Sequence, residues 1–376
     1  MREWISLNMT PGVGPRKATQ LLEKFGSAEN VFHATRGELE SLRLRAETVE
    51  SILKREFHAR AAAELERVKE IGGDVLILDD GSYPYLLREI ADPPITLYVK
   101  GDWQACFDAP CVGVIGSRKC STYGENASRM LARDLAENRI CVVSGLARGI
   151  DTAAHRGALL AKGRTIAVLG TGIDNVYPRE NKKLTEEILA TGGALVSQFP
   201  LETPPLKDNF PYRNRIISGL SYGVLLVEAS ERSGSLITAR LAMEQNREVM
   251  AVPGNITSRN SFGTNYLIKS GAKLVQQWQD VAAELPPEIS ARLLPPKLDE
   301  KAAAETASPQ TELAPADLSE NERRLWARLS PDEPKHIDAL LAESALSFGD
   351  LNNSLVGLDL KDLIRALPGN FYARKI

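Results

Sequence analysis

The stretch CVGVIGSRKCSTYG, residues 111–124, passes from a short apolar run through a glycine-containing turn into a polar segment. Its first part, Cys111 to Ile115, is β-branched and apolar, which is typical of a buried strand. Gly116 ends that run, and Ser121 is a favourable N-cap residue for a helix that begins next. The stretch therefore predicts a strand, a loop and a helix, the first unit of an α/β sheet.

The turn Gly116-Ser117-Arg118 has the composition of an anion-binding loop. A helix that follows a strand presents free backbone N–H groups and the positive end of its dipole at such a junction. Arg118 adds a guanidinium, whose planar fork matches phosphate oxygens. We therefore expect phosphate to be the ligand of this turn.

The alternation of strand and helix patterns continues from residue 111 to residue 280. Strands are predicted at 111–115, 140–143, 165–169, 194–197, 223–227, 248–252 and 273–275. Helices are predicted at 121–138, 150–161, 180–191, 211–220 and 235–246. This order indicates an α/β fold with a doubly wound, mostly parallel Rossmann-like sheet, which binds ligands at the carboxyl ends of its strands. Two earlier apolar runs, 75–78 and 95–99, are expected to extend one edge of the sheet.

Composition divides the chain into four parts. Residues 1–65 have a helical pattern, and residues 70–284 form the Rossmann-like domain. Residues 285–318 are rich in Pro, Ala, Glu and Ser, which is typical of a flexible linker. Residues 319–376 regain helical periodicity in three short segments and end in a small hairpin, which indicates a winged helix.

The turn at Pro11-Gly12-Val13-Gly14-Pro15 leaves two interpretations open. It resembles the helix-hairpin-helix motif, in which backbone N–H groups approach a nucleic-acid phosphate. It is equally compatible with a tight turn in a small helical packing domain.

Composition also limits the class of protein. The chain has 376 residues, 43% of them apolar, and its formal net charge is −3. We expect a cytoplasmic protein without membrane contact, because no apolar run reaches the length of a membrane span and the N-terminus does not resemble a secretory signal. The four cysteines lack paired spacing, so structural thiols are expected rather than a metal site. Only residues 111–280 are basic, with 21 Lys and Arg against 15 Asp and Glu.

Small and basic residues are concentrated in the loops that follow the predicted strands. Glycine and serine allow backbone amides to approach an anion, and Phe210 offers a ring on which a base can stack. Because these loops meet at one edge of the sheet, we expect one groove lined by Arg118, Arg179, Lys207, Arg213 and Arg215. The full set of candidate binding residues is Gly116, Ser117, Arg118, Ser144, Gly145, Arg179, Lys207, Phe210, Arg213, Asn214 and Arg215.

Cofactor chemistry is not expected at this groove. The first turn lacks the Gly-x-Gly-x-x-Gly fingerprint of dinucleotide sites, and the chain has no Walker motif. Asp151 and His155 fit capping and packing roles better than catalytic ones. Glu228 ends a predicted buried strand, where it suits either chemistry or the positioning of Arg213 or Arg215. We expect no catalytic residue, cofactor or metal.

Taken together, several strings resemble the DprA/Smf family of DNA-processing proteins, which acts in natural transformation. The matching strings are VIGSR at 114–118, SGLARGID at 144–151, AVLGTGID at 167–174, FPYRNRII at 210–217, SGSLITA at 233–239 and VPG at 252–254. The resemblance implies a non-catalytic protein that binds and protects incoming single-stranded DNA. It further implies loading of the RecA recombinase onto DNA covered by single-strand-binding protein, and a homodimer formed through the central domain.

The resemblance also implies roles for individual residues. Arg118 would hold a phosphate, Lys207 would contact the DNA backbone and Phe210 would stack on a base. Arg179 follows the Tyr-Pro pair where relatives have a basic residue, and Ser144 with Gly145 would offer backbone donors.

Two features set limits on this interpretation. Nucleotide phosphoribohydrolases share a Rossmann core and are the alternative, but Leu241 stands about where their catalytic Glu would fall. The C-terminal residues 321–376 carry eight Lys and Arg against eight Asp and Glu. Because strong DNA readers are basic, we assign no DNA contacts to this winged helix and consider partner binding or duplex sensing instead.

Overall fold

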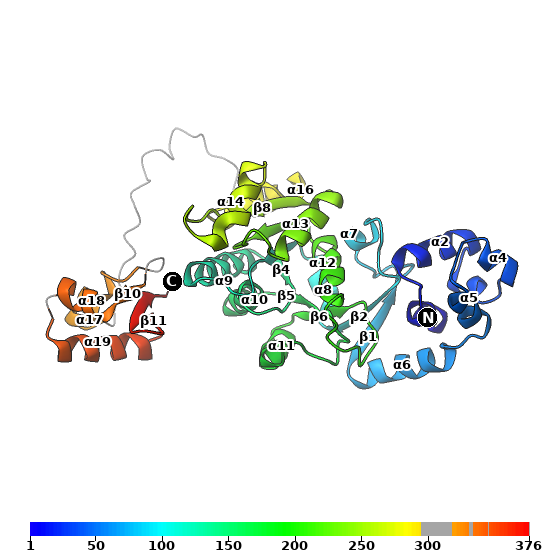
Figure 1. Cartoon of the computed structure of the whole chain (residues 1–376), viewed down its shortest axis with the longest axis horizontal. Coiled ribbons are helices and arrows are strands. Elements are labelled where there is room, and N and C mark those ends of the chain that lie inside the picture. Colours follow the sequence, from blue (N-terminus) through cyan, green and yellow to red (C-terminus); the bar gives the residue numbers. More distant parts are fainter. Residues whose placement is uncertain (295–317, 331–333, 345, 376) are drawn as a thin grey trace.

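The computed structural model describes residues 1–294, 318–330, 334–344 and 346–375. The chain begins with a helical region, drawn in blue in Figure 1. Its helices are α1 (Arg2–Met9), α2 (Pro15–Phe25), α3 (Ala28–Val31), α4 (Arg36–Glu40), α5 (Ala46–Leu53) and α6 (His58–Glu70). They enclose a core that includes Leu7, Leu21, Leu39 and Ile52. The helical pattern predicted for residues 1–65 is present.

The turn between α1 and α2 packs tightly against α5. Gly12 has a φ of +79°, and a Cβ at this position would lie 2.5 Å from Oγ1 of Thr48. The Thr48 hydroxyl donates a hydrogen bond to the carbonyl oxygen of Pro11 at 2.8 Å. These contacts account for the glycine by packing within the helical region.

A nine-stranded sheet forms the centre of the molecule (Figure 1). Its spatial order is β1-β2-β6-β5-β4-β3-β7-β8-β9. The pairs β1–β2 and β2–β6 are antiparallel, and all other pairs are parallel. The strands are β1 (Gly73–Ile77), β2 (Thr96–Gly101), β3 (Cys111–Ile115), β4 (Cys141–Ser144), β5 (Thr165–Val168), β6 (Ala194–Ser197), β7 (Gly223–Leu226), β8 (Glu248–Ala251) and β9 (Lys273–Leu274).

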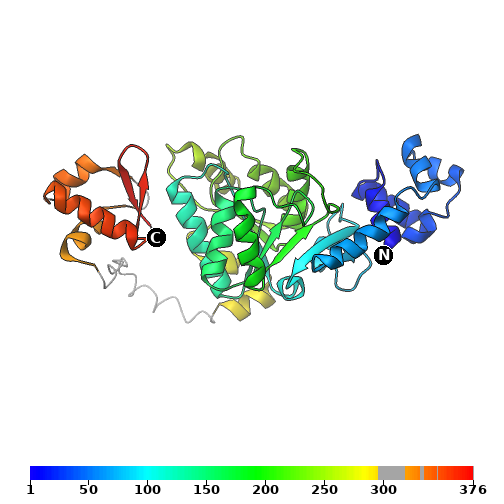
Figure 2. The ribbon, with the colours of Figure 1, turned by 90° about the horizontal axis from the view of Figure 1, so that it is seen from below.

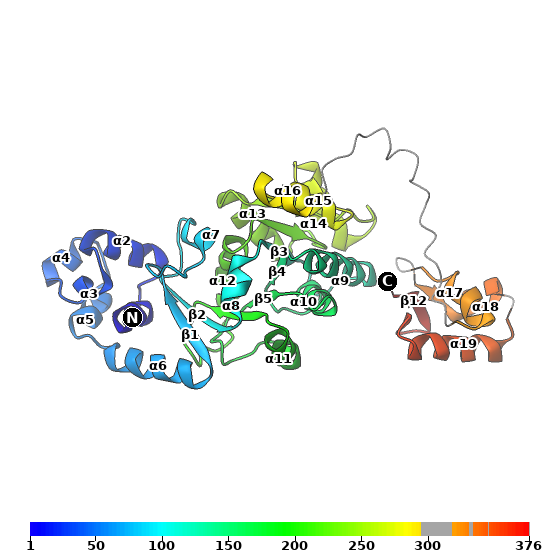
Figure 3. The same ribbon diagram turned by 180° about the vertical axis from the view of Figure 1, so that it is seen from behind.

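Helices cover both faces of this sheet (Figures 2 and 3). Val112 and Val114 of β3 pack in the core beneath one face, whereas Cys111 and Ile115 belong to the core of the other face. One face carries α9 (Thr122–Glu137), α10 (Ile150–Leu160) and α15 (Trp278–Ala283). The other carries α7 (Tyr85–Arg88), α8 (Trp103–Asp108), α12 (Asn209–Gly219), α13 (Ser235–Glu244) and α14 (Phe262–Lys269). The predicted doubly wound sheet is confirmed, with β1 and β2 extending one edge as expected.

Four further helical segments complete the central part. They are α11 (Lys182–Ala190), α16 (Pro287–Leu293) and the two 3₁₀ turns η1 (Arg179–Asn181) and η2 (Arg259–Ser261). Helix α16 lies within residues 285–318, for which we predicted a linker, and Ile289 and Leu293 pack onto the core beneath α9. Residues 295–317 of that predicted linker lie outside the described residues.

The C-terminal region contains the helices and the hairpin expected of a winged helix (Figure 2). It consists of α17 (Glu320–Trp326), β10 (Lys335–His336), α18 (Ile337–Ser344), α19 (Phe348–Leu360), β11 (Ile364–Leu367) and β12 (Phe371–Arg374). Leu325, Leu340, Leu351 and Leu355 form its core. Helix α19 carries two Asp and no Lys or Arg, so its surface lacks the cations that phosphate contacts require.

Glu228 joins the end of β7 to the start of α9. Its Oε2 accepts a hydrogen bond from the backbone N–H of Ser121 at 2.8 Å, and its Oε1 accepts one from the Ser121 hydroxyl. Its backbone oxygen accepts from the N–H of Ser117 at 2.8 Å. A Cβ on Gly124 would lie 2.4 Å from the carboxylate, so glycine is required there. Glu228 therefore holds the loop at residues 116–121, and it holds neither Arg213 nor Arg215.

Replacing Glu228 with alanine should lower the free energy of unfolding by about 1–3 kcal/mol, because a buried N–H loses its acceptor. Glu228→Gln retains an acceptor oxygen and should lose less. Urea denaturation of both variants measures the difference. Glu231→Ala, at an exposed position of the same loop, is the control and should stay within about 0.5 kcal/mol of wild type. Equal stability of wild type and Glu228→Ala would contradict this role.

Candidate nucleic-acid interface

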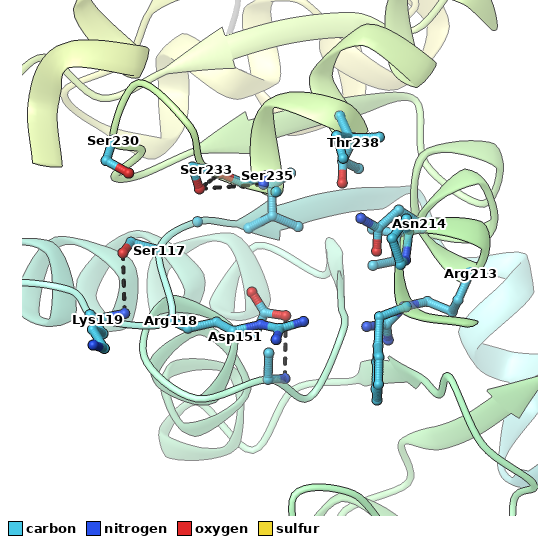
Figure 4. Close-up of a pocket in the computed structure, with 18 of the residues that line it drawn as sticks. Ser117, Arg118, Lys119, Asp151, Arg213, Asn214, Ser230, Ser233, Ser235 and Thr238 are labelled. Carbon is cyan, nitrogen blue, oxygen red and sulfur yellow. Dashed lines mark hydrogen bonds between the residues drawn. The ribbon is translucent and has the colours of Figure 1, made fainter. Parts of the chain in front are cut away.

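A cavity of about 740 Å³ lies at the carboxyl ends of β3 and β7 (Figure 4). These strands are neighbours, but the chain leaves β3 toward β4, β5 and β6 on one side and continues from β7 to β8 and β9 on the other. Helix α9 after β3 and helix α13 after β7 therefore cover opposite faces of the sheet. The loops separate at this point and leave a crevice, which is where open α/β sheets bind ligands.

The structure brings most of the predicted binding residues to this cavity. Its lining includes Gly116, Ser117, Arg118, Lys207, Phe210, Arg213 and Asn214. Gly145 lines a smaller adjoining cavity of about 60 Å³, which also contacts Arg118 and Phe210. The loop after β3, the loop after β4 and the start of α12 (Asn209–Gly219), which are far apart in the sequence, thus meet around one space.

Gly116 is the residue that allows the loop after β3 to lie this close to its neighbours. A Cβ at this position would lie 2.8 Å from the backbone oxygen of Glu228 and 2.7 Å from Cγ1 of Ile150. The loop is held further on by a hydrogen bond from the N–H of Lys119 to Oγ of Ser117, at 3.1 Å. The side-chain amide of Asn260 donates to the carbonyl oxygen of Lys119 at 3.0 Å. The backbone that carries Arg118 is therefore fixed before any ligand binds.

Arg118 and two aromatic rings form one side of the cavity. Cζ of Arg118 lies 5.5 Å from the centroid of the Phe210 ring, and the Tyr177 ring lies 5.4 Å from Phe210 at an angle of 44°. Within the part of the chain that the structure describes, no carboxylate lies within ion-pair distance of Arg118. Lys207 is exposed at the same rim. This side therefore combines positive charge with ring faces.

The floor of the cavity holds a buried arginine beside a buried carboxylate. Arg213 is 3% exposed and donates to the carbonyl oxygen of Gly145 at 2.9 Å and to that of Val168. Asp151 is 7% exposed, and its Oδ2 accepts from the N–H groups of Gly145 at 3.2 Å and Ala147 at 3.3 Å. A Cβ on Gly145 would lie 2.7 Å from both Nη2 of Arg213 and Oδ2 of Asp151. Gly145 is therefore required by packing.

Burial shifts the pKa values of both groups toward their neutral forms. Burial raises the pKa of Asp151 to about 6, although the positive charge of Arg213 opposes the shift. Burial also lowers the pKa of Arg213 to about 10, against the attraction of Asp151. At neutral pH both remain mainly charged, and the cavity floor carries one charge of each sign.

Three predicted residues do not line the groove that we expected. Ser144 is fully buried, and its hydroxyl donates to the carbonyl oxygen of Val114 at 2.6 Å. Arg215 is 3% exposed and points to Gln198, Asp92 and the ring of Tyr212. It lies two residues from Arg213 on α12, so the two side chains leave the helix in different directions.

Arg179 is exposed on η1 and lines neither cavity. Contrary to the groove that we expected, Arg179 therefore does not share a cavity with Arg118. Arg148, from the loop after β4, stands at the cavity instead.

Sequence reasoning also missed a polar wall opposite Arg118. The loop after β7 and the start of α13 contribute the hydroxyl groups of Ser230, Ser233, Ser235 and Thr238, which Figure 4 shows along the upper side of the cavity. The serines follow a predicted strand, so their position in the loop was a usable signal. Asn260, which comes from η2, had none.

Neither a metal site nor a membrane span is found in the described ranges. Among residues 1–294, 318–330, 334–344 and 346–375, no cluster of three or more His, Cys, Asp or Glu is placed to hold a metal ion. None of the helices there is both long enough and apolar enough to cross a bilayer.

Comparison with known proteins agrees with this geometry. Residues 74–286 match the family described as DNA recombination-mediator protein A, and residues 309–370 match the DprA winged helix domain. Protein Smf of Escherichia coli is 41% identical over 78% of this chain and 75% of its own length. Protein Smf of Synechocystis is 34% identical over 99% of this chain and 98% of its own length.

Two solved structures are similar as well. The structure of DNA processing protein A from Streptococcus pneumoniae has a TM-score of 0.67 at 38% identity, and it covers 76% of this chain and 98% of that one. The protein of the same name from Helicobacter pylori, whose structure was described for its single-stranded DNA binding mode, has a TM-score of 0.50 at 33% identity, with 56% and 93% coverage. On the basis of the sheet, the winged helix and these similarities, the chain belongs to the DprA/Smf family of DNA-processing proteins.

Proposed function

We propose that this protein binds single-stranded DNA in the cavity between β3 and β7 and along its rim. The observation that carries the proposal is the guanidinium of Arg118 beside the Phe210 ring, at the mouth of a cavity of about 740 Å³. A phosphate is attracted by the cation, and a neighbouring base stacks on the ring. In a duplex the bases stack on one another and do not offer a free face, so single strands are preferred.

The contacts predict little sequence preference. Phosphate contacts position a strand, and stacking accepts any base. The relative from Helicobacter pylori, described for single-stranded DNA binding, supports the same ligand here. Because the protein covers the DNA that it binds, it would also protect that DNA from other proteins.

Family membership is what supports the later steps of the proposal. By its resemblance to the DprA/Smf family, the protein would load RecA onto DNA covered by single-strand-binding protein and would act as a homodimer in the cytoplasm.

The carboxylates in and near the cavity are engaged in hydrogen bonds within the protein, which favours binding without catalysis. Asp151 is the one carboxylate among the described residues that line the cavity, and two backbone N–H groups occupy its Oδ2. Glu228 is committed to Ser121. Leu241, which stands where nucleotide phosphoribohydrolases have a Glu, offers no acid or base.

Arg118→Ala should weaken binding of a labelled oligo-dT strand and reduce the salt slope of log Kd by about 0.7, the value for one lost phosphate contact. Fluorescence anisotropy over a series of salt concentrations, with the matching duplex alongside, measures both quantities. Arg156→Ala, at an exposed position of α10, is the matched control and should behave as wild type. An unchanged slope and affinity in Arg118→Ala, or equal binding of duplex and single strand, would refute the proposal.

Asp151→Asn should bind the strand more tightly than wild type at pH 7.5, because a negative charge near the phosphate is removed. As the pH falls through about 6, the wild-type carboxyl takes up a proton and loses its charge. The ratio of the two Kd values should therefore approach one at pH 5, from roughly threefold to tenfold at pH 7.5, tenfold being about 1.4 kcal/mol. A ratio that stays constant between these pH values would show that Asp151 does not act on the strand by its charge.

For a dimer through the central domain, we propose an exposed apolar face on α14 as the contact surface. Phe262 and Tyr266 lie one turn apart, at 52% and 60% exposure. Because large exposed apolar side chains on one helix face favour association, Tyr266→Glu should shift the protein toward the monomer. Light scattering after size exclusion measures the mass. Tyr85→Glu, a 69% exposed tyrosine elsewhere, is the control; an unchanged mass in Tyr266→Glu would place the contact on another surface.

A further inference from the structure

Arg148 stands at the edge of the smaller cavity with its guanidinium already paired. It lines this space together with Arg118, Tyr177 and Phe210. Its Nε donates to Oε1 of Glu180 at 2.7 Å, and its Nη2 donates to Oε2 at 2.7 Å. The two side chains therefore form a parallel, bidentate pair.

The backbone on both sides of this pair is fixed. Glu180 belongs to η1, and its neighbour Asn181 is 4% exposed. The Asn181 side-chain amide donates to the carbonyl oxygen of Leu146 and to the hydroxyl of Thr152, both at 2.9 Å. The turn that carries Glu180 is thus fastened to the loop that carries Arg148, and the carboxylate faces the guanidinium as a built arrangement.

The ion pair between Arg148 and Glu180 is exposed to solvent, so another anion can readily replace the carboxylate. The exposed fractions of the Arg148 and Glu180 side chains are 63% and 54%. The pKa of Glu180 is lowered by its hydrogen bond with Arg148, and both groups are charged at neutral pH. Exposed ion pairs contribute little, because water competes for both partners.

A phosphate group is the natural replacement for the Glu180 carboxylate. Both present two oxygens with the spacing that the guanidinium fork accepts. Arg148 shares its cavity with Arg118 and Phe210, the residues on which the proposed strand would lie. A strand held by Arg118 therefore brings a neighbouring phosphate within reach of Arg148.

We propose that Arg148 is a further phosphate-binding residue and that Glu180 is its positioning residue, which holds the guanidinium until a phosphate of the strand replaces the carboxylate. The inference rests on the proposed single-strand binding. In the free protein the pair is neutral, so the rim carries one free positive charge fewer than its sequence indicates. The guanidinium of Arg148 leaves Glu180 only when a phosphate of the bound DNA takes the place of the carboxylate.

A double-mutant cycle tests the coupling, with labelled oligo-dT titrated by fluorescence anisotropy at several salt concentrations. Arg148→Ala should weaken binding and lower the salt slope by about 0.7. Glu180→Gln should tighten binding by up to about fivefold, the equivalent of about 1 kcal/mol, without changing the slope. In the Arg148→Ala background, Glu180→Gln should have no effect, because the group that it releases is absent.

Two further variants and one further measurement serve as controls. Glu186→Gln, at an exposed position of α11 that lines neither cavity, is the matched control for the loss of a negative charge. Arg148→Lys keeps the charge without the fork and should recover the salt slope but only part of the affinity. Urea denaturation of each variant confirms that the fold is retained.

The outcomes separate this inference from the function on which it rests. If the gain from Glu180→Gln persists in the Arg148→Ala background, Glu180 acts by simple repulsion and the positioning role is overturned. If Arg148→Ala binds as wild type while Arg118→Ala does not, Arg148 takes up no phosphate and the strand site stands without it. If the wild type does not bind oligo-dT, both the proposed function and this inference fail.

Discussion

The parallel pairing of β3 with β4 on one side and with β7 on the other is the constraint on which the rest of the structure depends. It places the first strand of the α/β region in the middle of the sheet. The helices after β3 and β7 must then cover opposite faces, and the space between their loops cannot be closed by either. The cavity, its floor and its rim follow from this strand order.

Hydrogen bonds to buried side chains then shape the loops around that space. Glu228 holds the start of α9, and Arg213 and Asp151 both form hydrogen bonds with the backbone of the loop after β4. Both interactions bury charge, which is tolerated because each group receives hydrogen bonds from or donates them to the chain. The loops are therefore ordered before any ligand binds, which reduces the entropy that binding would cost.

The central region and the C-terminal region differ in the positive charge that they present. The central region carries a surplus of Lys and Arg and holds Arg118 and Lys207 at an open rim. The C-terminal region has a helix, α19, without any Lys or Arg. A phosphate backbone is attracted to the first surface far more than to the second. That the winged helix makes no DNA contacts stays a prediction.

The strand and helix order was predictable from the sequence, because period-2 and helical apolar patterns depend on neighbours along the chain. The same holds for Gly116, Ser117 and Arg118, which follow directly from their place after a strand. Arg215 was misplaced, because a composition rule cannot tell which way a side chain leaves its helix.

Only the tertiary structure decided the remaining contacts. The serines of the loop after β7 were visible in the sequence, but their place opposite Arg118 depends on β7 lying beside β3. In this pairing Val112 lies opposite Gly223, 111 positions further along the chain. The pairing of Arg148 with Glu180 depends likewise on Asn181 fastening two loops. Sequence patterns determine which elements form, whereas contacts between distant segments are set by how those elements pack, since packing joins residues that share no local pattern.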